Sequence, residues 1–317
     1  MSGAINWFNG GLEWHHTFLS EYAPWMEKLK SFRIRVFGVH GRISPISPLG
    51  PQQFFRQDKK NLFKNKDGIF EERKLLLSGL DLSGKLNGCL LTCAAVLELE
   101  GCMGLNNLFD SVGTFVYLKS LSISSSNVRL KPTGGCRSPN DLLPNLEKLN
   151  LIFLHSLESI SELVGSLGLK FSRLKVMRVL FCPKLKYLLS YDDFTQPLEK
   201  LELISLSNCT NLSDMFIYSS GDTSMPYPVA PNLQAIMLFG LPNLKTLSRQ
   251  EETWQHLEHI FVRNCRSLKK LPLNEQSANT LKEIRGEQEW WKQLEWDDDV
   301  TSSTLQPLFK GPAPWYL

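Results

Sequence analysis

Apolar residues recur along the chain at one fixed spacing, which is clearest in two successive copies between residues 233 and 271. Both copies fit the pattern L-x-x-L-x-L-x-x-C/L-x-x-L-x-x-L. The first copy consists of Leu233, Ile236, Leu238, Leu241, Leu244 and Leu247, and the second of Leu257, Ile260, Val262, Cys265, Leu268 and Leu271. The central x-L-x-L-x has a period of two, which is typical of a strand with one face in the core. Each copy therefore predicts a short strand, a turn and a looser return.

The same pattern can be traced through most of the chain. With the first strand leucine as the anchor, the copies fall at residues 97, 121, 149, 177, 204, 236, 260 and 284, which are 24 to 32 residues apart. This spacing is the signature of the leucine-rich repeat, and one such coil cannot bury its own apolar face without stacked neighbours. We therefore predict an α/β solenoid, a leucine-rich-repeat horseshoe with a parallel β-sheet on the concave face and irregular or short helical returns on the convex face.

The pattern also divides the chain into four segments. We expect an irregular N-terminal segment with a possible first coil at 1–40, a polar loop or insertion at 41–69, the solenoid at 70–284, and a C-terminal cap and tail at 285–317. Trp290, Trp291 and Trp296 supply the aromatic bulk that an exposed last coil needs. A chain that starts inside a solenoid would expose an uncapped apolar end, which indicates a truncated gene product or an excised fragment.

Composition and charge narrow the class of protein. The chain has 317 residues, of which 42% are hydrophobic and 21% are charged, as in ordinary folded domains. The net charge of +3 is not clustered, so we expect no nucleic-acid partner. No run of about 18 apolar residues occurs, and we therefore predict no membrane span and a cytoplasmic location.

Four of the seven cysteines share one position of the repeat. Cys102, Cys182, Cys209 and Cys265 each occupy the ninth place of a coil, where the turn requires a small buried side chain. No cysteine pair has the close spacing of a metal or redox site. We interpret these residues as reduced structural thiols and expect neither a metal nor a cofactor.

Motifs for catalysis are missing from the sequence. Residues 79–85 spell G-x-x-x-x-G-K, but Leu86 stands where a phosphate-binding loop has the hydroxyl that holds Mg²⁺, and Leu80 and Leu82 already belong to the repeat. Neither H-E-x-x-H nor G-x-S-x-G occurs. We therefore expect a binding protein and not an enzyme, with no catalytic residues.

A binding site is predicted on the concave face, because the x positions of x-L-x-L-x point away from the core. Apolar and cationic residues gather at these positions in the C-terminal half. The predicted protein-binding residues are Arg178, Leu180, Leu203, Met237, Phe239, His259, Phe261, Arg263 and Arg285. We expect the five apolar members to face the solvent beside the arginines, which is the composition of an interaction hot spot.

Two sequence features point to a family. Leu-Pro-Asn-Leu occurs at 143–146 and 241–244, and the run at 281–287 is followed by Trp290-Trp291. These features resemble the C-terminal leucine-rich-repeat region of plant intracellular nucleotide-binding leucine-rich-repeat disease resistance proteins of the coiled-coil class, over about residues 70–310. The resemblance implies a module that senses a pathogen effector or a guarded host protein, and that holds off a nucleotide-binding switch domain. This chain lacks the motifs of that domain.

Two other readings of the repeat remain. A substrate-receptor adaptor of a ubiquitin ligase also uses cysteine-bearing repeats, but it needs an F-box-like three-helix segment, for which residues 1–28 are too short and interrupted by glycine. A secreted repeat receptor would show uniform coils with asparagine at the ninth position, whereas these coils vary in length and carry cysteine there. The adaptor stays as the alternative function.

Overall fold

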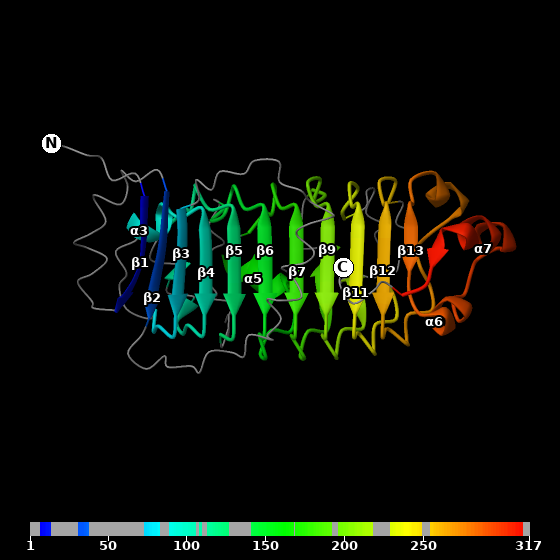
Figure 1. The fold of residues 1–317 in the computed structure, drawn as a ribbon, viewed down its shortest axis with the longest axis horizontal. Coiled ribbons are helices and arrows are strands. Elements are labelled where there is room, and N and C mark those ends of the chain that lie inside the picture. Colours follow the sequence, from blue (N-terminus) through cyan, green and yellow to red (C-terminus); the bar gives the residue numbers. More distant parts are fainter. Residues whose placement is uncertain are drawn as a thin grey trace.

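The computed structural model of the chain is a solenoid of parallel strands, which runs in Figure 1 from the blue β1 to the orange β13. The structure describes residues 7–13, 31–37, 73–82, 89–105, 108–109, 113–126, 141–167, 169–191, 196–217, 229–248 and 254–312. Twelve strands of this part form one sheet, namely β1 (Trp7–Glu13), β2 (Ser31–Phe37), β3 (Arg73–Ser78), β4 (Val96–Glu100), β5 (Ser120–Ser124), β6 (Lys148–Ile152), β7 (Val176–Leu180), β9 (Leu203–Ser207), β11 (Ala235–Phe239), β12 (His259–Arg263), β13 (Glu283–Arg285) and β14 (Phe309–Lys310).

Every pair of neighbouring strands in this sheet is parallel, and equivalent positions of successive coils lie side by side. Leu149 pairs with Met177, for example, and Leu151 with Val179. The main-sheet strands from β4 to β12 begin and end at the residues that the x-L-x-L-x pattern predicts, which confirms the leucine-rich-repeat solenoid. A shift of one residue would turn the leucines outward, so the buried face fixes the register.

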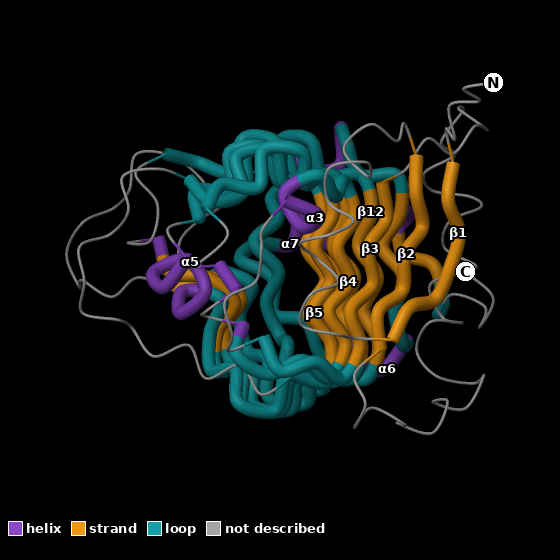
Figure 2. Tube along the Cα trace, turned by 90° about the vertical axis from the view of Figure 1, so that its left-hand side faces the viewer, coloured by secondary structure: helices purple, strands orange, loops and turns teal. Residues whose placement is uncertain are grey.

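The returns on the other side of the coils contain short elements. β8 (Tyr187–Ser190) and β10 (Asp214–Ile217) form a separate two-stranded parallel sheet. Figure 2 shows this pair and α5 (Ser161–Leu167) across the coil from the main sheet. A further short helix, α3 (Cys89–Thr92), follows β3. The convex face thus combines loops, a helix and a strand pair.

The core lies between the main sheet and the returns. In the main-sheet strands from β3 to β12 both apolar positions of the repeat are buried, as are the apolar repeat positions of the returns; Leu151 and Leu157, for example, have no exposed area. Burying such a side chain contributes about 2 kcal/mol relative to exposure. Leu80 and Leu82, within the segment that imitates a phosphate-binding loop, are also buried. They are part of the core that joins one coil to the next.

The ninth-position thiols are buried and reduced, as the sequence predicts. Each of three donates a hydrogen bond to a strand carbonyl of the preceding coil: Cys102 Sγ to Leu77 O at 3.4 Å, Cys209 Sγ to Val179 O at 3.7 Å, and Cys265 Sγ to Leu238 O at 3.6 Å. Burial raises the pKa of Cys102 and Cys265 to about 11. Cys102 and Cys265 therefore act as neutral donors that tie neighbouring coils together.

The residue after each main-sheet strand from β3 to β12 adopts a left-handed backbone conformation, with φ between 51° and 64°. These residues are Gly79, Gly101, Ser125, Phe153, Phe181, Asn208, Gly240 and Asn264. The backbone N–H at this position donates to the carbonyl that ends the next strand, as in Gly101 N to Ser124 O at 2.8 Å and Gly240 N to Arg263 O at 2.8 Å. The turn is therefore a second hydrogen-bonded ladder beside the sheet.

The asparagines of the Pro-Asn-Leu turns explain why that motif recurs. Asn145 Nδ2 donates to Val116 O at 2.7 Å, and Asn243 Nδ2 donates to Thr210 O at 2.8 Å. Asn232, in Ala-Pro-Asn-Leu, makes the equivalent bond to Glu199 O at 2.8 Å. Each amide satisfies a carbonyl in the turn of the preceding coil, which would otherwise need water.

Helices lie between β13 and β14, the last two strands of the main sheet. After β13 come α6 (Gln288–Lys292), α7 (Asp299–Leu305) and the 3₁₀ turn η3 (Gln306–Leu308), while η2 (Glu275–Asn279) precedes β13. Trp290 is buried and donates through Nε1 to Leu268 O at 2.9 Å. Trp291 is buried as well and stacks on Phe309, with ring centroids 4.5 Å apart. The aromatic side chains thus cover the apolar end of the core.

Strands β1 and β2 lie in the N-terminal region, for which the sequence predicts an irregular segment with a possible first coil. Trp7–Glu13 forms a strand, β1, that pairs in parallel with β2 over seven positions. Its sequence WFNGGLE lacks the alternation that marks the later strands, so the pattern gave no signal there. The predicted insertion at 41–69 lies outside the described residues. None of the helices in the described part of the chain is long and apolar enough to cross a membrane.

Candidate functional site

The concave side of the sheet presents three side-chain positions from each strand, because alternate residues face away from the core. The parallel register aligns these positions into three rows. From β7 to β13 the first row holds Val176, Leu203, Ala235, His259 and Glu283, the second holds Arg178, Ser205, Met237, Phe261 and Arg285, and the third holds Leu180, Ser207, Phe239 and Arg263. The nine predicted residues therefore share one surface, which extends over roughly 19 Å at about 4.8 Å per strand. We call it the C-terminal concave surface.

The first row contains a small apolar cluster of its own. Val176, Leu203 and Ala235 pack together, separate from the main core, and Met237 packs against them. Only 3% of Leu203 is exposed, so the prediction that this side chain faces the solvent is wrong. Side chains at the same place on neighbouring strands are close enough to bury one another, and a pattern read along one strand cannot reveal this.

Two more of the predicted apolar residues are buried. Leu180 is 1% and Phe261 is 6% exposed, which contradicts the expected exposure. The Phe261 ring lies nearly parallel to the His259 ring, with their centroids 6.1 Å apart. Met237 and Phe239 are half-buried. The apolar area that this surface offers to a partner thus comes from Met237 and Phe239, while the buried residues set its shape.

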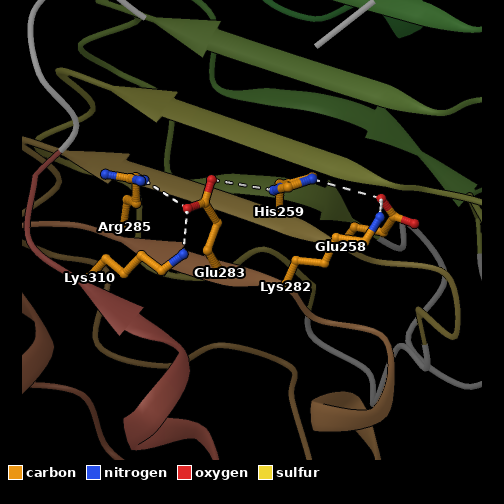
Figure 3. A network of polar contacts seen from close by, with 6 residues as sticks. All are labelled: Glu258, His259, Lys282, Glu283, Arg285 and Lys310. Atoms are coloured by element: carbon orange, nitrogen blue, oxygen red, sulfur yellow. Dashed lines mark hydrogen bonds and ion pairs between the residues drawn. The ribbon is translucent and has the colours of Figure 1, made fainter. Parts of the chain in front are cut away.

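A network of charged side chains lies at the C-terminal end of the surface (Figure 3). Glu283 Oε2 accepts from Arg285 Nε at 2.9 Å and from Lys310 Nζ at 3.2 Å. Its other oxygen, Oε1, lies 3.5 Å from His259 Nδ1, and His259 Nε2 lies 3.7 Å from Glu258 Oε2. Lys282 Nζ completes the chain of contacts at 2.6 Å from Glu258 Oε2.

The charges in this network hold Glu283 ionised. Burial alone would raise the pKa of this carboxyl group, but the hydrogen bonds from Lys310 and Arg285 outweigh burial and lower it. Glu283 is 16% exposed at its side chain and Arg285 is 23% exposed, so the pair is only partly hydrated. An ion pair in such a place is screened less than one on an open surface.

The remaining predicted residues, Arg178 and Arg263, are half-buried in the second and third rows. Sequence reasoning missed Glu258, Lys282 and Lys310. Lys310 joins the surface through β14, whose two residues leave no periodic signal. Glu258 and Lys282 precede their strands, where the repeat pattern assigns no position facing the concave side.

The C-terminal concave surface combines apolar and cationic side chains. Within the described residues, no three His, Cys, Asp or Glu side chains gather in a way that could hold a metal ion. The surface instead offers half-buried apolar groups beside oriented cations. Such a combination suits a protein partner that buries apolar area and meets positive charge.

The fold and this surface define a leucine-rich-repeat protein. A family model described as plant disease resistance protein RPS2-like, leucine-rich repeats, matches residues 168–284. Disease resistance protein At4g27190 of Arabidopsis thaliana is 35% identical over 255 residues, which cover 75% of this chain and 25% of that protein. Probable disease resistance protein At4g27220 of the same plant is 36% identical over 218 residues, covering 64% of this chain and 24% of that protein. The chain belongs to the leucine-rich-repeat regions of plant disease resistance proteins.

The similarity to these relatives covers only part of their length. The chain spans about a quarter of the length of these relatives. Disease resistance protein UNI of Arabidopsis thaliana is 24% identical over 295 residues, or 90% of this chain and 28% of that protein. The predicted membership in the repeat region of such proteins is confirmed, while the coiled-coil class stays a prediction.

Proposed function

We propose that the C-terminal concave surface recognises a protein, either a pathogen effector or a guarded host protein, as part of a plant intracellular immune receptor. The names of the relatives support a role in disease resistance. They favour this role over an adaptor of a ubiquitin ligase. The observation that carries the proposal is the placing of Met237 and Phe239, both half-buried, in rows that end in Arg285 and Arg263.

In the same proposal, the C-terminal concave surface also contacts a nucleotide-binding switch domain and holds it inactive. A nucleotide-binding switch domain, held inactive by contact with the solenoid, is the other partner that the resemblance implies. Partners of both kinds would compete if they use the same rows. We assign recognition and not catalysis to this region, and the cytoplasmic location rests on the resemblance.

The test compares the wild-type chain with Phe239→Glu, which places a charge in the apolar part of the surface. Val300→Glu is the matched control, because Val300 is 56% exposed on α7, outside the three rows. Proteins captured from plant extract by the wild type and by Val300→Glu are identified, purified and titrated against all three chains by calorimetry. We expect a partner whose affinity falls about tenfold or more with Phe239→Glu alone. Equal affinity for all three chains would refute the concave site.

A further inference from the structure

Arg285 and Lys310 converge on one acceptor. They are partners across the β13–β14 register, and both donate to Oε2 of Glu283, at 2.9 Å and 3.2 Å. One carboxylate thus faces two cations, while its second oxygen faces the ring of His259. The positive charge of this pair exceeds what Glu283 alone can neutralise. The excess lies at the edge of the C-terminal concave surface.

The ion pair orients the guanidinium of Arg285. Its Nε–H is taken by Glu283, and among the residues that the structure describes no ion pair engages its two terminal NH₂ groups. A guanidinium is planar, so fixing Nε also fixes the plane of the terminal groups. Those groups form the fork that binds a carboxylate through two parallel hydrogen bonds.

The position of Arg285 strengthens any such bond. In the second row its neighbour is the buried Phe261, and the next residue is the half-buried Met237. The Arg285 side chain itself is 23% exposed. Charge-assisted hydrogen bonds contribute more in a partly dehydrated site than on an open surface, where an ion pair contributes little.

From this geometry we propose that Arg285 and Lys310 form a carboxylate-binding subsite that takes an Asp or Glu side chain of the protein partner. The inference rests on the proposed function and deepens it. β11 lies two strand spacings from β13, or about 9.6 Å at about 4.8 Å per strand, so an apolar side chain about two residues away on the same extended partner segment reaches Met237 or Phe239. The recognised element is therefore an acidic residue close to an apolar one.

A random dodecapeptide library displayed on phage tests the subsite without knowledge of the natural partner. The purified full chain is the bait, and peptides that also bind Phe239→Glu are removed. We expect the remaining peptides to be enriched in Asp or Glu within about two residues of a large apolar side chain. A synthetic copy of one peptide is then titrated by fluorescence anisotropy.

Variants of the chain separate the subsite from general effects of charge. Arg285→Gln should weaken binding of the peptide about tenfold or more, as expected when a charge-assisted hydrogen bond is lost. Arg285→Lys keeps the charge without the fork and should give an intermediate loss. Glu283 keeps Lys310 as a partner in both variants, so the fold is retained, which the thermal midpoint checks. Lys186→Gln, which removes a cation paired with Glu158 on a return, is the control and should change nothing.

A change in the peptide, combined with Arg285→Gln in the protein, gives a double-mutant cycle. Replacing its acidic residue by the amide should cost as much as Arg285→Gln, and the two changes together should cost little more than either alone. Equal binding of the acidic and amide peptides, or no enrichment at all, would overturn the subsite. If the peptides depend on Phe239 but not on Arg285, the proposed function stands and the subsite fails. If no peptide is sensitive to Phe239→Glu, the concave site itself fails.

Discussion

The backbone N–H of Asn264 donates to the carboxylate of Glu287, at 3.0 Å from Oε1 and 3.3 Å from Oε2. In each preceding coil from β3 onward, the equivalent N–H donates to the carbonyl that ends the next strand, as Asn208 does to Phe239 O at 2.8 Å. β13 stops at Arg285, and the carbonyl of Glu287 at the equivalent place accepts from Trp291 N at 3.0 Å in α6. The carboxylate of Glu287 takes over as acceptor, so this side chain ends the ladder of turns.

Removing the carboxylate should weaken the C-terminal end of the solenoid. Glu287→Ala leaves the Asn264 N–H to water, and we expect a loss of about 1 kcal/mol in the free energy of unfolding. Glu287→Gln keeps an acceptor oxygen and should lose less. Urea unfolding followed by tryptophan fluorescence measures the difference, since Trp290 and Trp291 lie next to the site in sequence. An unchanged midpoint for Glu287→Ala would mean that water serves the N–H equally well.

Gly286 is required by the packing of Trp290. A Cβ atom added at Gly286 would collide with the Trp290 ring and would also lie 3.3 Å from Val262 O. The ring cannot move freely because it is buried and its Nε1 is hydrogen-bonded to Leu268 O. We therefore expect Gly286→Ala to lower stability by about 2 kcal/mol, the usual cost of overpacking a core.

Gly311→Ala is the control for that substitution, because a Cβ there has no atom within 4 Å. Thermal unfolding should show a lower midpoint for Gly286→Ala than for the wild type, and an unchanged midpoint for Gly311→Ala. A normal midpoint for both variants would show that the tryptophan shifts to make room.

Gly240 and Gly113 separate backbone strain from side-chain collision. Both are left-handed, with φ of +62° and +77°, so an alanine costs about 1 kcal/mol at either place. At Gly240 a Cβ would also lie 2.5 Å from Asn208 Oδ1, whereas at Gly113 nothing lies within 4 Å. Gly240→Ala should therefore be the more destabilising in urea unfolding. Adding Asn208→Gly, which removes the side chain and keeps a residue that adopts the left-handed conformation of position 208, should recover the difference. Equal losses in the two single variants would argue against the collision.

The repeat pattern predicted the strands because each coil repeats the same local rule. Leu149 and Leu151 point inward from β6, and the residues on either side of them face outward. This alternation is set along one strand and does not depend on the neighbouring coils. The exposure of the outward residues depends on other coils. Leu203 and Phe261 are buried by contacts across strands that are 24 to 32 residues apart in sequence, so no window along one strand contains the information.

Some of the left-handed turns can be predicted from the local sequence, and others cannot. A glycine such as Gly240, or an asparagine such as Asn208, indicates a left-handed turn, because these residues adopt it readily. Phe153 and Phe181 give no such signal, yet both have a φ of 55°. Their N–H groups join the ladder, to Leu180 O at 3.0 Å and to Ser207 O at 2.8 Å. Stacking of the coils imposes the conformation, and it also aligns the two rings, whose centroids are 4.7 Å apart.

The buried thiols predict a loss of stability in alkaline solution. Burial raises the pKa of Cys102 and Cys265 from the ordinary value of 9.0 to about 11. Between these values the unfolded chain releases the thiol protons while the folded chain keeps them. The unfolded state therefore binds fewer protons, and the free energy of unfolding falls as pH rises through this window.

The double variant Cys102→Ala/Cys265→Ala isolates this effect from other groups that titrate near pH 10. At pH 8 the wild type should be the more stable, because the thiols donate to Leu77 O and Leu238 O and fill their sites. At pH 10 the difference in urea midpoint between wild type and variant should shrink, since only the wild type carries these two thiols. A difference that stays constant from pH 8 to pH 10 would mean that the thiols ionise as easily in the folded chain as in the unfolded one.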